Sequence, residues 1–298
     1  MKTNYLLLVV STILIFVSAC KNDTQMKPPV AKKIPKELKI HGDTRIDNYY
    51  WMNDREDSAV IAYLEKENAY RESIMKHTEE LQSNLYDEIV GRIKQTDMSV
   101  PYFLNSYYYY TRYEEGKEYP IYCRKKSSLE ADEEIMLNVN EMAEGYAFYQ
   151  IGGLSVSPDN KIIAYGVDTL SRRIYNIHFK NLETGEIYED RIPSTTGSVA
   201  WANDNKTFFY TVKDEQTLRP YKVMKHKLGE PESSDELIFQ EDDETFVTAA
   251  YKTKSREYIM IGSFATLSNE FRYLDAGEPD GEFTVIQPRI RELEYSVS

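Results

Sequence analysis

The chain of 298 residues is acidic, with 49 Asp and Glu against 36 Lys and Arg and a formal net charge of -13. This balance, together with the lack of a long Lys/Arg-rich block, argues against a nucleic-acid-binding protein, and no nucleic-acid partner is expected. A hydrophobic content of 41% suffices for a packed core, in one large domain or two small ones. The sequence shows no zinc-ligand spacing, P-loop or dinucleotide fingerprint, so no metal or cofactor is predicted.

Residues 1–19 have the composition of a secretory signal. Lys2 is the one charged residue, and an almost continuous apolar run follows at 6–17. The run is short for a membrane span, which needs about 20 apolar residues. The stretch Val17-Ser18-Ala19-Cys20 resembles the lipobox of bacterial lipoproteins, and this resemblance implies acylation of Cys20. The chain is therefore expected to be exported and lipid-anchored to the bacterial membrane, on its periplasmic or cell-surface face. The alternative is an ordinary cleaved signal with a chance cysteine.

A polar tether and a helical segment are predicted next. Residues 20–39 are polar, rich in lysine and interrupted by three prolines, which is typical of a spacer. Residues 40–97 are predicted to be mainly helical. We expect Asp54 or Asp57 to cap the start of the helix and the helix to end near Thr96. One apolar stripe on it is formed by residues spaced by four, namely Leu81, Leu85, Ile89 and Ile93.

Residues 98–298 are predicted to be β-structure, because strand-like runs alternate with turn signals. A strand-turn pattern that begins at Ser157 recurs at Ala202, 45 residues later, and a looser copy begins at Thr253. A period of about 40 to 50 residues is typical of β-propeller blades, with a β-sandwich as the alternative. We expect about four blades, and the opening strand of another near Arg291.

Three motifs carry a resemblance to a known family. The segment 41–54, "HGDTRIDNYYWMND", resembles the N-terminal signature of the prolyl oligopeptidase family. The motif "AYLEKENAY" at 62–70 and the segment 92–126 are closer to oligopeptidase B (protease II) than to prolyl oligopeptidase itself. The similarity runs from about Ile34 to the last residue.

The resemblance implies a seven-bladed propeller over an α/β-hydrolase domain onto which the N-terminal segment packs. It implies a serine peptidase that cleaves short peptides after Lys or Arg, with a Ser-Asp-His triad whose serine lies in a G-x-S-x-G elbow. The propeller would act as a size filter. This sequence departs from the pattern, because no G-x-S-x-G occurs and Gly153-Leu154-Ser155-Val156-Ser157 fails at its last position.

The expected fold is therefore mainly β, a partial seven-bladed-type propeller preceded by a helical segment, without the α/β-hydrolase domain. The family triad has no counterpart to carry over, so no catalytic residue is predicted and the 298-residue chain is expected to be inactive alone. The missing hydrolase domain and short Lys/Arg-containing peptides are the expected partners. A non-catalytic, lipid-anchored binding propeller is the alternative, and a structural surface lipoprotein is a third.

The four histidines offer no clear catalytic group. His41 with Asp43 has the residue types of a base and its orienting carboxylate, but both lie in a segment that matches a structural part of the family. His77, on a charged helix face, and His178, within a strand, are expected to be structural. His226 lies among lysines near a strand end, where a solvated side chain is expected.

Two further features favour plain structural roles. Cys123 alternates within a strand-like run and is predicted to be a buried small hydrophobe, with a reactive thiol as the alternative. If Cys20 is acylated, no intrachain disulfide is possible. The acidic run 241–244 could attract Ca²⁺, but it lacks the spacing of an EF-hand loop, and a solvated loop is favoured. Cys20, as a lipidation site, is thus the one site residue predicted.

Overall fold

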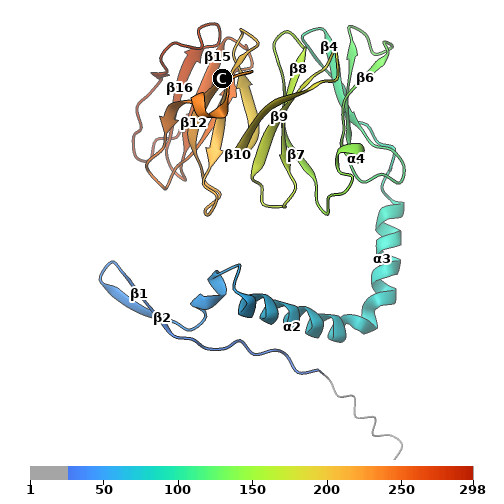
Figure 1. The fold of residues 1–298 in the computed structure, drawn as a ribbon, viewed down its shortest axis with the longest axis vertical. Coiled ribbons are helices and arrows are strands. Elements are labelled where there is room, and N and C mark those ends of the chain that lie inside the picture. The colour runs from blue at the N-terminus through green and yellow to red at the C-terminus, as the bar shows by residue number, and fades with distance from the viewer. Residues whose placement is uncertain (1–25, 298) are drawn as a thin grey trace, which may run out of the picture. The chain divides into compact units, whose positions relative to one another are not determined.

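The structure is a computed structural model that describes residues 26–297 (Figure 1). The predicted signal peptide and Cys20 lie outside the described residues. The chain divides into two compact units, Met1–Lys94 and Gln95–Ser298, a division that falls close to the predicted boundary at 97/98. In the described part of the chain, no helix is both long and apolar enough to cross a membrane.

The first regular element in the described part of the first unit is a β-hairpin. Strand β1 (Lys36–Ile40) pairs antiparallel with β2 (Asp43–Asp47). His41 and Gly42 form the turn, with φ angles of 52° and 79°. Positive φ angles at both central residues are what a type I′ turn in a two-residue hairpin requires. Residues 36–39, predicted as the end of the tether, therefore belong to a strand, because His41-Gly42 folds the chain back onto itself.

Helices follow the hairpin. They are η1 (Tyr50–Asn53), α2 (Ser58–Met75), η2 (Lys76–Thr78) and α3 (Glu79–Gly91). The carboxylate of Asp57 accepts a hydrogen bond from the backbone N–H of Ala59 at 2.8 Å, which confirms Asp57 as the cap of α2. The helix ends at Gly91 and not near Thr96. The apolar stripe lies on α3 except for Ile93, which follows its end, and the four side chains are 46% to 59% exposed.

The second unit is an antiparallel meander in three sheets. The first sheet contains β3 (Tyr102–Leu104), β4 (Tyr107–Arg112), β5 (Ile121–Lys126) and β6 (Glu133–Asn138), followed by α4 (Val139–Met142). The last contains β14 (Val247–Lys252), β15 (Tyr258–Phe264), β16 (Asn269–Asp275) and β17 (Thr284–Val285). In both sheets, neighbours in the chain are neighbours in space, which confirms the mainly β prediction.

The middle sheet has seven strands. They are β7 (Gln150–Val156), β8 (Ile162–Asp168), β9 (Tyr175–Asn181), β10 (Ile187–Trp201), β11 (Thr207–Lys213), β12 (Pro220–Lys227) and β13 (Glu236–Gln240), with η3 (Glu232–Ser234) before β13. The long strand β10 pairs with β9 over Ile187–Thr195 and with β11 over Thr195–Trp201. The sheet is therefore two four-strand meanders that share β10. The predicted number of about four blades stays a prediction.

A glycine contact brings β10 against β7. Gly197 in β10 has a φ of +91°, and a Cβ atom there would lie 2.5 Å from the carbonyl oxygen of Gly152 in β7. A Cβ on Gly166 in β8 would lie 2.5 Å from the Cα of Gly197. Only residues without a side chain allow the three strands to approach this closely.

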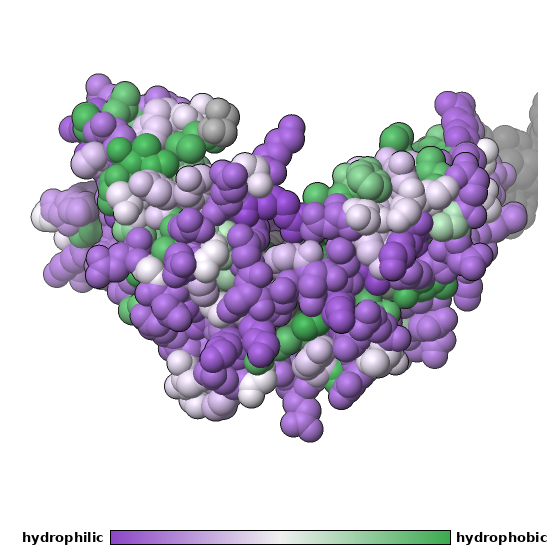
Figure 2. Space-filling view, turned by 90° about the horizontal axis from the view of Figure 1, so that it is seen from above, coloured by the Kyte–Doolittle hydropathy of each residue, from purple (hydrophilic) through white to green (hydrophobic). Residues whose placement is uncertain are grey.

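Apolar side chains fill the spaces between the sheets. One buried cluster joins Tyr109 and Leu137 of the first sheet to Ile163 and Tyr165 of the middle sheet. Another joins Phe209 of the middle sheet to residues of the last sheet, Ile259, Ile261 and Leu274. The sheets are thus held face to face by hydrophobic burial, at about 1.5 to 3 kcal/mol for each fully buried large side chain. Hydrophilic residues cover most of the face shown in Figure 2, in keeping with the net charge of the chain.

The segment 286–297 corrects one prediction. These residues form no strand, whereas the opening strand of another blade was expected near Arg291. Arg289 instead forms an ion pair with Glu241 at 2.6 Å, and the hydroxyl of Tyr295 accepts a hydrogen bond from the backbone N–H of Phe271 at 2.9 Å. These contacts hold the segment as an irregular loop against β16.

Candidate functional site

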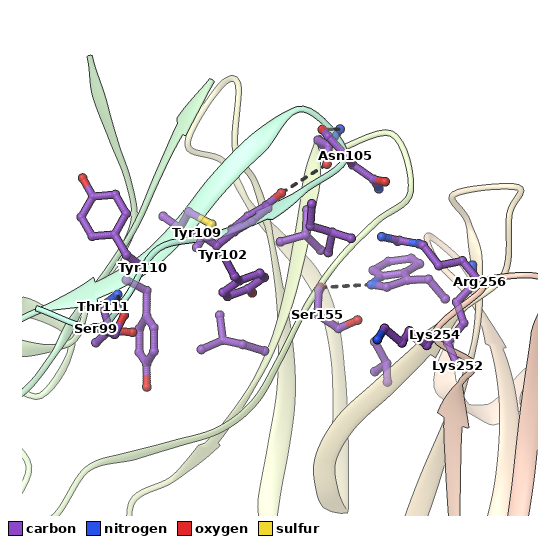
Figure 3. Close-up of a pocket in the computed structure, with 18 of the residues that line it drawn as sticks. Ser99, Tyr102, Asn105, Tyr109, Tyr110, Thr111, Ser155, Lys252, Lys254 and Arg256 are labelled. Carbon is purple, nitrogen blue, oxygen red and sulfur yellow. Dashed lines mark hydrogen bonds between the residues drawn. The ribbon is translucent and has the colours of Figure 1, made fainter. Parts of the chain in front are cut away.

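A pocket of about 460 Å³ opens in the β unit where the first strands of the successive meanders meet (Figure 3). Its lining comes mainly from β3, β4, β7 and β10 and from the end of β14 with the turn that follows it, and β5 and β6 contribute Tyr122 and Met136. The repeated strand-turn pattern explains this convergence, because each first strand ends in an equivalent turn at the same edge of the unit.

One wall of the pocket is aromatic. Tyr102 on β3 stacks on Tyr109 on β4, with 5.5 Å between the ring centroids. The hydroxyl of Tyr109 donates to the side-chain oxygen of Asn160 at 3.2 Å, and the Asn160 amide donates to the carbonyl of Asn105 at 3.1 Å. Burial raises the pKa of Tyr109, against the opposing charge of Arg124, so the phenol is neutral. The wall is therefore an uncharged surface fixed by hydrogen bonds between two turns.

The facing wall is basic, and Figure 3 shows its side chains across the pocket from the tyrosines. Lys252 at the end of β14 donates from Nζ to the side-chain oxygen of Asn203 at 2.6 Å. Burial, and then the charge of Arg256, lowers the pKa of Lys252 to about 8. Lys254 and Arg256 follow in the turn, where Arg256 has a φ of 67°.

The base of the pocket is formed by β7 and β10. Trp201 donates from its indole N–H to the backbone carbonyl of Ser155 at 3.1 Å, which joins the two strands. Among the described residues, those that line the pocket include no histidine, cysteine or carboxylate. A nucleophile activated by a histidine or a carboxylate is therefore missing from this lining, whose cations and tyrosines suit binding.

A second polar cluster lies inside the β unit. His226 on β12 is 1% exposed, and its Nδ1 and Nε2 lie 2.6 Å from Asp235 and 3.3 Å from Asp190. The hydroxyl of Tyr210 donates to Asp235 at 2.7 Å, and the backbone N–H of Gly229 donates to Asp190 at 2.6 Å. Burial lowers the pKa of His226, but the two carboxylates outweigh burial and the net pKa is raised. The cluster is a buried, hydrogen-bonded ion network.

The sequence model described as "Prolyl oligopeptidase, N-terminal beta-propeller domain" matches residues 28–298. The chain belongs to the prolyl oligopeptidase family. Dipeptidyl aminopeptidase BI of Pseudoxanthomonas mexicana is 40% identical over 286 residues, and Protease 2 of Moraxella lacunata is 35% identical over 279 residues. The matches cover 90% and 91% of this chain but 39% and 40% of the relatives. The chain thus spans about two fifths of their length.

Solved structures of the family agree in fold. Oligopeptidase B from Leishmania major superposes with a TM-score of 0.86 at 32% identity, covering 91% of this chain and 41% of that one. Oligopeptidase B from Trypanosoma brucei gives a TM-score of 0.82 at 29% identity, again over 91% and 41%. The predicted family resemblance and the propeller fold of the N-terminal part are confirmed, and the described residues contain no α/β-hydrolase domain.

The structure confirms the predicted environment of two residues, Cys123 and His178, and corrects that of His226. Cys123 is 0% exposed, as predicted, and burial raises the pKa of its thiol to about 12. His178 is half-buried on β9 and stacks on Tyr165 at 5.7 Å. His226, predicted to be solvated, is buried, because Asp190 and Asp235 supply the charges that its burial requires.

The acidic run 241–244 also needs a correction. Glu241 is 4% exposed, not solvated, because Arg289 pairs with its carboxylate at 2.6 Å. Burial raises the pKa of Glu241, but the Arg289 contacts outweigh it and the net pKa is lowered. Asp242, Asp243 and Glu244 are exposed, as expected for a loop.

The other candidates are not among the residues that line the pocket. His41 is an exposed turn residue, and Asp43 accepts a hydrogen bond from the backbone N–H of Thr44 at 2.9 Å. His77 is exposed in η2, where its Nδ1 lies 2.9 Å from the carbonyl oxygen of Ile74. Ser157 is buried, and its hydroxyl donates to Asp159 at 2.6 Å.

Sequence reasoning did not single out the pocket. The signal was available in the aligned repeats, since Asn160 and Arg256 occupy related turns after first strands. Equivalent turns of a propeller meet at one end of the central axis. Turn residues at repeat-equivalent positions are thus the ones that the fold brings together.

Proposed function

We propose that this chain is the propeller portion of an exported serine peptidase that resembles oligopeptidase B, cleaves short peptides after Lys or Arg, and uses the propeller to limit substrate size. The observation that carries the proposal is the match to Leishmania major oligopeptidase B, with a TM-score of 0.86 over 91% of this chain. The 35% identity to Protease 2 of Moraxella lacunata supports the same activity class.

The chemistry of the described residues supports a division of labour within the protein. The described residues that line the pocket include no histidine, cysteine or carboxylate, and the sequence contains no G-x-S-x-G nucleophile elbow. The α/β-hydrolase part known from the family would supply the Ser-Asp-His triad. The propeller would then contribute binding and access, and cleavage would take place elsewhere in the whole protein.

The test captures the protein from its source cells with an antibody against residues 95–298, after detergent extraction. We expect the captured protein to react with a serine-directed fluorophosphonate, to hydrolyse an Arg-amide chromogenic peptide and to leave folded proteins uncut. The recombinant 298-residue chain is the matched control, and we expect no turnover from it. Captured protein that neither reacts nor hydrolyses would favour the non-catalytic, lipid-anchored binding propeller.

Release of N-terminal dipeptides is a second candidate activity, because the 40% identical relative is named dipeptidyl aminopeptidase BI. The same captured protein separates the two activities. Acetylation of the substrate N-terminus abolishes dipeptide release but leaves internal cleavage after Lys or Arg intact. Loss of turnover on acetylation would favour the second candidate.

A further inference from the structure

The basic wall of the pocket carries charge that the protein does not neutralise. In the described part of the chain, neither Lys254 nor Arg256 makes an ion pair or a side-chain hydrogen bond. Arg124, by contrast, pairs with Glu134 at 2.7 Å, and Arg289 pairs with Glu241 at 2.6 Å. The chain has a net charge of -13, so unpaired cations that line one pocket stand out against its overall charge. Such cations would attract an anionic ligand to the pocket.

Lys252 strengthens this argument, since it is half-buried and its one hydrogen-bond partner among the described residues is the neutral amide of Asn203. Burial and the nearby Arg256 lower the pKa of Lys252 to about 8 although the charge of Asp204 acts in the opposite direction, so the charge of Lys252 is only partly compensated. A bound carboxylate would supply the missing compensation.

The opposite wall indicates what else the ligand carries. Tyr102 is 59% exposed although it lines the pocket, and Leu104 beside it is 38% exposed. Both belong to β3, which pairs only with β4 among the described strands and so leaves one edge unpaired. An unpaired strand edge offers N–H and C=O groups to another extended chain, which favours a peptide over a nucleotide.

We infer that this pocket binds a short peptide that places an apolar or aromatic side chain against Tyr102 and Leu104 and a carboxylate against Lys252, Lys254 and Arg256. The volume of about 460 Å³ lies within the range of small-ligand pockets and is large for an isolated anion. The inference goes beyond the proposed peptidase activity and does not depend on it.

The experiment uses calorimetric titration of the full 298-residue chain with acetyl-Phe-Glu, which carries two carboxylates. The matched probe is acetyl-Phe-Gln-amide, which has the same shape and no charge. We expect the charged probe to bind at least about tenfold more tightly, since a charged hydrogen-bonding partner is lost in the neutral probe. Equal affinity for the two probes would overturn the inference.

Variants assign the binding to the pocket. Arg256→Gln and Lys254→Gln should each lower the affinity for acetyl-Phe-Glu by about three- to tenfold, because each variant removes an unpaired cation. Lys206→Gln is the control, since Lys206 is exposed in the neighbouring β10–β11 turn, carries the same charge and does not line the pocket. Loss of affinity in the control but not in the pocket variants would contradict the assignment.

A charge-reversal variant and a competing nucleotide probe complete the test. The double variant Lys254→Glu with Arg256→Glu should reverse the preference, binding acetyl-Phe-Lys-amide more tightly than acetyl-Phe-Glu. Such a gain cannot arise from simple unfolding. Adenosine monophosphate is the competing probe, and binding of this nucleotide more tightly than the peptide, with the same dependence on Arg256, would overturn the peptide assignment.

Discussion

His226 shows how far the environment of one residue departs from its sequence context. Its neighbours in the chain are lysines, yet its ring lies against Phe208 at 4.9 Å and between the carboxylates of Asp190 and Asp235. A buried histidine with two carboxylate partners is stabilised as the cation, because each ring N–H then donates to an anion. The cluster therefore contributes to stability in a manner that depends on pH.

We expect His226→Gln to lower the free energy of unfolding by about 3 kcal/mol near neutral or lower pH, because two buried carboxylates would lose their cation. The net pKa of His226 is raised from 6.5, so its contribution is complete below that value and is lost as the pH rises through the folded-state pKa. Urea unfolding of both proteins between about pH 6 and pH 9 measures the difference.

The control is His178→Gln, in which a half-buried histidine is removed whose pKa burial lowers. The free energy of unfolding of this variant should still fall as the pH rises, as it does in the wild type. If the gap between wild type and His226→Gln stayed constant across the pH range, the ionic role of His226 would be wrong.

Residues with local causes were predictable, and residues with distant partners were not. Asp57 caps a helix through Ala59, two positions away, and Cys123 alternates within its own strand. His226 depends on Asp190, 36 positions away, and Glu241 depends on Arg289, 48 positions away. Such pairs are set by how the sheets stack, and a single sequence does not carry that information.

At the scale of elements, the sequence repeat predicted the strands and the turns within each repeat. It did not predict how one repeat connects to the next. The strand runs and the Asp57 cap follow from periodicity and turn chemistry. Periodicity and turn chemistry do not predict three other features, namely the break between α2 and α3, the shared strand β10 and the irregular segment 286–297. The pocket was missed for the same reason, since it is made by neighbouring repeats together.

We expect Gly197→Ala to be among the more costly substitutions in the unit. A Cβ at this position would lie 2.5 Å from the carbonyl oxygen of Gly152, and φ is +91°. The positive φ costs about 1 to 2 kcal/mol and overpacking adds about 1 to 3 kcal/mol. The shift in the urea unfolding midpoint measures the sum.

Gly185→Ala separates the two contributions, because Gly185 has a φ of +80° and no neighbouring atom lies within 4 Å of the position that a Cβ would occupy. This variant should show the backbone cost alone. Equal losses of stability in the two variants would mean that β10 moves away from β7 without penalty.

At the scale of the whole molecule, the proposed lipid anchor would decide where the protein acts. Acyl chains contribute about 0.8 kcal/mol per buried CH₂, so several chains on Cys20 would hold the protein stably on a membrane. We expect a bacterial host fed radioactive palmitate to label the wild-type chain and to retain it in the membrane fraction. The Cys20→Ser variant should carry no label.

Cys123→Ser is the matched control for the labelling experiment, because the Cys123 thiol is 0% exposed in the folded protein. It should be labelled as strongly as the wild type. Label retained by Cys20→Ser would rule out acylation at the predicted position alone, and a wild-type chain without label would favour the ordinary cleaved signal.

The shared strand β10 has a consequence for how the propeller comes apart. Its first half completes the ladder with β9 and its second half begins the ladder with β11, through one uninterrupted backbone of 15 residues. Since the two ladders meet at Thr195 on one strand, unfolding of β10 breaks both, and we expect β7 to β13 to open and close as one cooperative unit. Between β13 and β14, by contrast, no strand pairing is found in the described chain, so the middle and last sheets are coupled by buried side chains and not by a shared ladder.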